Sequence, residues 1–182
     1  MGKSFFHRYF EDYTEEKIPG SDGKMHITRT YRGFWYAPQL TQGQRILRAA
    51  AYLLLYAGGL ALFILGAMRP CACNVAWYVA IATGLSLFSA LIELIPLCGC
   101  ALGKAEQTVY QYRSGHRTCV LWARITAGCM ASTALLAILA TLLAGETIGA
   151  AVLLFALGAL CEAAVGEAES RVSYERRHNA NA

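Results

Sequence analysis

Three ionisable residues interrupt the apolar runs of this sequence: Glu93, Arg124 and Glu162. We expect each of them about one turn inside the same end of its helix. A charged side chain costs about 2.5–3.5 kcal/mol at the centre of a membrane span on insertion scales, and it tends to face the interior of a bundle. Because equal depth would place Arg124 between the two carboxylates, the sequence predicts a polar cluster of these three residues.

Two interpretations of this cluster remain open. It is either a functional group, as a polar vestibule or an ion-coupling site, or a structural ion pair that keeps three helices in register. Long side chains one turn from the interface can also extend to water at low cost. The structural interpretation is therefore favoured.

Cysteine is the second residue type that could do chemistry. Cys71 and Cys73 form a Cys-Ala-Cys pair in a short predicted link between helices, which makes them a weak candidate for metal or redox chemistry. A four-coordinate metal site needs more ligands than two thiolates. Cysteine also serves as a small apolar packing residue in helices.

Motifs of enzymatic catalysis are absent from the sequence. It has no Gly-rich phosphate loop, no His-Glu-x-x-His pair and no nucleophile elbow. We therefore expect no catalytic residue, no cofactor and no enzymatic activity. The net charge of +4 is mild, and we expect no nucleic-acid partner.

The elements that must position these residues are apolar helices. About 20 apolar residues in a helix cross a hydrocarbon core of about 30 Å, and lipid leaves no other partner for the backbone amides. The predicted fold is an all-α membrane protein, an antiparallel bundle of four transmembrane helices within residues 45–166. The helices are expected over about 45–68, 75–97, 119–143 and 147–166, with the second ending at Pro96 and Gly99.

Residues 1–44 are predicted to form a juxtamembrane region. Aromatic residues recur at spacings of three and four from Phe5 to Tyr13, which predicts a short amphipathic helix or, equally well, a disordered aromatic arm. The alternation from Lys24 to Arg32 predicts a strand that forms a β-hairpin with the segment before the Asp22-Gly23 turn. Thr41 and Gln44 fit a capping box at the start of the first helix.

The distribution of positive charge predicts the orientation. Of the 16 Lys and Arg residues, all but Arg69 fall in residues 1–48, in residues 98–124 or in the tail 167–182. The positive-inside rule then places both termini in the cytoplasm of a cell-membrane protein. The last residues of the tail are expected to be partly disordered.

These observations favour a non-enzymatic accessory or interaction subunit. Its expected partners are the lipid bilayer and another membrane protein or further copies of the chain. The alternative is a small oligomeric transporter or channel, and a weaker alternative is a thiol-redox or metal-handling protein.

Overall fold

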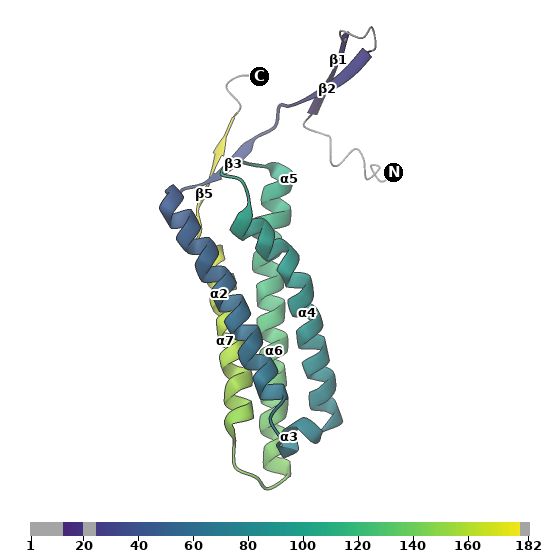
Figure 1. The fold of residues 1–182 in the computed structure, drawn as a ribbon, viewed down its shortest axis with the longest axis vertical. Helices are drawn as coiled ribbons and strands as arrows, with labels where there is room; N and C mark the ends of the chain where they lie inside the picture. The colour runs from purple at the N-terminus through teal and green to yellow at the C-terminus, as the bar shows by residue number, and fades with distance from the viewer. Residues whose placement is uncertain (1–12, 20–24, 179–182) are drawn as a thin grey trace.

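Four long helices dominate the computed structural model, which describes residues 13–19 and 25–178 (Figure 1). They are long and apolar enough to span a membrane, as the sequence predicts. They are α2 (Gln42–Ala67), α4 (Trp77–Leu102), α6 (Thr118–Leu143) and α7 (Ala150–Ser170).

The helices run up and down in an antiparallel bundle (Figure 1). We call the end where α2 begins and α7 ends the terminal end (Figure 1). Large apolar side chains on the outside of all four helices remain exposed, for example Leu54, Leu85, Leu135 and Leu157. Such a surface is unfavourable in water and suits contact with lipid.

The helix boundaries depart from the sequence prediction at the terminal end. α4 continues to Leu102 and contains Pro96, and α7 continues to Ser170. Proline removes one backbone donor, but neighbouring helices make this tolerable in apolar helices. Pro96 is buried within the bundle, so it does not end the helix as the sequence led us to expect.

Local sequence signals explain the other helix ends. The Thr41–Gln44 capping box forms as predicted, with the Thr41 amide donating to Gln44 Oε1 at 2.9 Å. After α6, Gly145 adopts φ 71°, and the Glu146 amide donates to the Thr141 carbonyl at 3.1 Å. This Schellman-type ending turns the chain directly into α7. The link between α2 and α4 holds a short helix, α3 (Ala72–Val75).

The predicted hairpin is present and antiparallel. It consists of β1 (Tyr13–Pro19) and β2 (Met25–Tyr31), with Tyr13 opposite Tyr31 and Pro19 opposite Met25. Figure 1 shows the hairpin beyond the terminal end of the bundle. The predicted amphipathic helix lies outside the described residues except for Tyr13, which begins β1.

A three-stranded sheet, which the sequence did not predict, covers the terminal end. Its central strand β3 pairs antiparallel with the other two strands. The strands are β3 (Trp35–Pro38), β4 (Gln107–Thr108) and β5 (Tyr174–Arg177). Between β4 and α6 the chain forms a short helix, α5 (Val109–Tyr112), and a π-helical turn, η1 (Arg113–Arg117).

Candidate functional site

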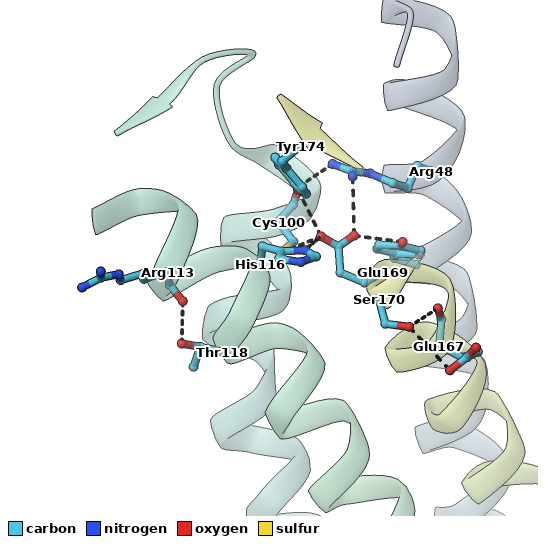
Figure 2. A network of polar contacts seen from close by, with 10 residues as sticks. Arg48, Cys100, Arg113, His116, Thr118, Glu167, Glu169, Ser170 and Tyr174 are labelled. Atoms are coloured by element: carbon cyan, nitrogen blue, oxygen red, sulfur yellow. Dashed lines mark hydrogen bonds and ion pairs between the residues drawn. The ribbon is translucent and has the colours of Figure 1, made fainter. Parts of the chain in front are cut away.

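A buried carboxylate, Glu169 of α7, gathers polar side chains from four other elements at the terminal end (Figure 2). Tyr52 from α2 donates to Oε2 at 2.9 Å, and Tyr174 from β5 donates to Oε1 at 3.1 Å. His116 Nδ1 lies 2.6 Å from Oε1. We call this group the terminal cluster; it comprises Arg48, Tyr52, Cys100, His116, Glu169 and Tyr174.

Charge compensation makes this burial tolerable. Arg48 Nη1 lies 3.5 Å from Glu169 Oε2, and Arg48 Nη2 donates to the Cys100 carbonyl at 3.4 Å. Burial and the adjacent Glu169 carboxylate raise the pKa of Tyr174 above its ordinary value, so its hydroxyl remains a donor at neutral pH. A carboxylate with this many donors is held in one orientation.

The π-helical turn brings His116 to the cluster. π-turns are rare and often occur at functional sites. In η1 the turn places His116 against Glu169, while its ring stacks on Tyr112 with centroids 5.1 Å apart. Tyr112 in turn stacks on Tyr36 of β3, at 4.3 Å and 6°. A continuous series of ring contacts therefore joins the central strand of the sheet to the buried carboxylate.

A second polar group lies deeper in the bundle. Glu93 on α4 and Glu162 on α7 are 0% exposed and are direct neighbours of one another. Thr126 on α6, also 0% exposed, lies against Glu93. We call these three residues the inner cluster.

Arg124 does not join the inner cluster. Its side chain is exposed, and within the described residues no ion pair connects it to either glutamate. Ala123 and Thr126 occupy the buried face of α6 at this level, which leaves Arg124 on the outer face. The structure thus brings together two of the three residues that the sequence singled out.

The two glutamates also lie deeper than one turn. Glu93 precedes the end of α4 by nine residues, and Glu162 precedes the end of α7 by eight. At 1.5 Å per residue these separations are about 13 and 12 Å. The difference arises because both helices extend beyond their predicted ends.

The two clusters are successive layers of one buried polar line. Its members recur every seven residues on each helix, the spacing that keeps a side chain on the inner face of a bundle. They are Cys100, Glu93 and Ser86 on α4, Cys119, Thr126 and Thr133 on α6, and Glu169 and Glu162 on α7. Ser86 and Thr133 also contact each other, at 3.0 Å between their hydroxyl oxygens.

Cys71 and Cys73 lie together at the opposite end of the bundle. Their sulfur atoms are 2.8 Å apart, and both are free thiols. Burial, followed by the contact with Cys71, raises the pKa of Cys73 to about 11. No group of three or more His, Cys, Asp or Glu side chains within residues 13–19 and 25–178 is arranged to hold a metal ion.

Sequence reasoning missed the terminal cluster, although one signal was present. Glu169 follows Glu162 by seven residues, so both belong to the same face if α7 continues past Gly166. The partners of Glu169 come from α2, α4, η1 and β5, and no local pattern connects those segments.

Comparisons with known proteins add no family to this description. No family model matches the chain, and no curated protein or solved structure is detectably similar to it.

Proposed function

We propose that the chain is a non-enzymatic, multi-pass integral membrane protein that acts as an interaction subunit through its cytoplasmic face. In this proposal all four long helices span the cell membrane. The bias of Lys and Arg toward the terminal end supports placing both termini in the cytoplasm.

The hairpin carries the proposal. It is a sheet of only two strands, and within the described part of the chain no third strand pairs with it. A lone two-stranded hairpin is marginally stable in water. Ile27 on β2 is nevertheless 54% exposed. A partner that packs on this face would bury an apolar side chain and stabilise the hairpin.

The base of the hairpin is fixed to the bundle. Tyr31, at the end of β2, is buried, and its hydroxyl donates to the Phe34 carbonyl at 3.0 Å. The same hydroxyl accepts from the Val109 amide at 3.2 Å. Val109 begins α5, and α5 continues into η1, which carries His116 of the terminal cluster. The segment α5–η1 therefore contacts both the base of the hairpin and the terminal cluster. The hairpin is therefore presented in a defined position, as an interaction element requires.

Photo-crosslinking from position 27 tests the proposal. A photoreactive amino acid in place of Ile27 is expected to give one dominant crosslink to a second protein in native membranes. The matched control carries the same residue at Val75, which is exposed at the opposite end of the bundle. Equal crosslinking from both positions, or crosslinks only to lipid, would overturn the proposal.

A second candidate function is transport by an oligomer, favoured by the buried polar line. Ionisable residues within membrane spans often mark ion pathways or proton relays. Against transport by a single copy, large side chains such as Phe63, Phe155, Leu97 and Met130 fill the bundle interior. Ion flux into liposomes that contain the purified protein distinguishes this candidate from the interaction subunit.

A weaker candidate is thiol chemistry at Cys71 and Cys73, favoured by the contact between their sulfur atoms. It requires an accessible thiolate, whereas burial keeps Cys73 protonated at neutral pH.

A further inference from the structure

The two glutamates of the inner cluster lack the cation and the hydrogen-bond donors that offset the negative charge of Glu169. Glu93 and Glu162 are 0% exposed, and no hydrogen bond of ordinary geometry reaches any of their four carboxylate oxygens from the described residues, although Glu93 lies close to both Glu162 and Thr126. The Thr126 hydroxyl, against Glu93, is equally buried and equally without a partner. Five polar oxygens therefore meet in the interior of the bundle with their bonding capacity unused.

Among the described residues, the titratable groups that face this pair supply no positive charge. Tyr56 from α2 and Cys119 from α6 are its titratable neighbours, together with the other glutamate of the pair. The Tyr56 hydroxyl already donates to the Ala90 carbonyl, at 2.8 Å. Arg124, the nearest cation along α6, lies on the exposed face.

Two adjacent ionised carboxylates in this position would be strongly unfavourable. Each would lose its hydration, and the two negative charges would repel one another. One added proton removes the repulsion, because the protonated carboxyl can then donate a hydrogen bond to its ionised neighbour. Paired carboxylates that share a proton are a known solution to this problem.

From this geometry we propose that Glu93 and Glu162 form a proton-binding site inside the bundle, occupied at neutral pH. The proton lies between the two carboxyl groups, and the Thr126 hydroxyl lies beside Glu93 as the nearest neutral polar group. A hard cation such as Ca²⁺ fits less well, because it takes six to eight oxygen ligands. The site goes beyond the proposed interaction function and does not depend on it.

Glu169 provides an internal reference. It lies on the same helix as Glu162 and is equally buried, but it has Arg48, Tyr52 and Tyr174 around it. Burial is therefore common to both sites, and compensation of the negative charge distinguishes them.

Infrared spectroscopy of the full chain in lipid nanodiscs tests the proposal. At pH 7 we expect the carbonyl-stretch absorption of a protonated carboxylic acid. It should disappear in the double variant Glu93→Gln/Glu162→Gln and persist in Glu167→Gln, whose side chain is exposed on α7. Glutamine matches the shape of a protonated glutamate, so the double variant should remain folded.

Three results would overturn the proposal. They are absence of this absorption in the wild type at pH 7, its persistence in the double variant, and its removal by Na⁺ or Ca²⁺ at constant pH. The last result would identify a metal-cation site instead.

A second measurement needs no variant. Dicyclohexylcarbodiimide reacts with protonated carboxyls in apolar surroundings. The carboxyl oxygen adds to the central carbon of the carbodiimide while the proton passes to nitrogen, which gives an O-acylisourea. The acyl group then migrates from that oxygen to the neighbouring nitrogen, so a stable N-acylurea forms without a leaving group. Peptide mapping should find the adduct on Glu93 or Glu162 and not on Glu167 or Glu169. An adduct on Glu169 with none on the inner pair would contradict the proposal.

Discussion

At the scale of single residues, the two buried glutamates of α7 illustrate how partners decide the state of a charge. Glu169 is surrounded by donors and a guanidinium, whereas Glu162 has a second carboxylate beside it. A buried, paired charge contributes little net stability, but removing one partner leaves the other uncompensated. Glu169 should therefore be sensitive to substitution.

We expect Glu169→Gln to lower the free energy of unfolding by about 3–5 kcal/mol, because the guanidinium of Arg48, whose side chain is only 11% exposed, then lacks its counter-charge. The measurement is unfolding of the purified protein in mild detergent. Glu167→Gln is the matched control, because Glu167 pairs with Arg171 in an exposed ion pair. Equal stability of the two variants would show that the terminal cluster does not support the fold.

Cys73 gives a prediction that depends on pH. Its pKa is raised to about 11, and only the thiolate is nucleophilic. Modification of Cys73 by a thiol reagent should therefore be slow at pH 7 and accelerate as pH rises toward 11. The free energy of unfolding should also depend on this pKa. The contribution of the neutral Cys73 thiol is present at neutral pH and is lost as pH rises through the raised pKa. Peptide mapping after timed labelling measures the rate, and rapid labelling at pH 7 would contradict the assignment.

Some of these residues could be found from the sequence. Glu93 and Glu162 are visible as charges in apolar runs, and the structure brings them together. Arg124 is also a charge in an apolar run, but it lies on the exposed face of α6. The apolar residues of α6 show no clear periodicity, so the sequence did not indicate which of them face inward. The partners of Glu169 are separated by up to 126 residues, from Arg48 to Tyr174, and only the folded chain unites them.

At the scale of elements, the close crossing of α2 and α7 depends on two glycines. A Cβ atom on Gly158 would lie 2.9 Å from the Gly59 carbonyl oxygen and 3.1 Å from Phe63 Cβ. Small residues at such crossings let helix backbones approach closely in membranes. Phe63 then packs on Phe155, with ring centroids 4.9 Å apart.

Gly158→Ala is therefore expected to destabilise the bundle, because the new methyl group would collide with the α2 backbone. Gly128→Ala on α6 is the matched control, since nothing lies within 4 Å of its added Cβ. The control should be neutral or stabilising by up to about 1 kcal/mol, the difference in helix propensity. Thermal unfolding in detergent compares the two variants, and the opposite order would contradict this crossing.

The sequence predicted the presence of the long helices better than it predicted where they end. The apolar runs predicted all four long helices, and the Thr41 capping box predicted the start of α2 correctly. The ends of α4 and α7 were placed too early, because Pro96 and the charged residues after Gly166 normally terminate helices. Burial of Pro96 and the partners of Glu169 let both helices continue.

At the scale of the whole molecule, the helices of the bundle follow one another along the chain, whereas the three-stranded sheet at the terminal end joins segments that are far apart in the sequence. Each long helix packs beside the next one in the sequence, and the links α2–α4 and α6–α7 are short, so hydropathy predicts the bundle. The sheet joins β3, β4 and β5, which lie about 70 residues apart along the chain and together contain only ten residues. Strands this short leave no clear pattern.

The proposed orientation predicts where the termini are accessible. Epitope tags on both termini should be cleaved by protease added to inside-out vesicles and protected in right-side-out vesicles. Cleavage of only one tag in either preparation would contradict an even number of spans, and the reverse pattern would contradict the cytoplasmic placement.

The mass of the protein purified from native membranes in mild detergent tests the interaction function most directly. We expect a complex that contains a second protein. The complex should lose that protein when Ile27 is replaced by Lys and keep it in the Val75→Lys variant. A homo-oligomer or a monomer that binds no other protein would contradict the interaction function.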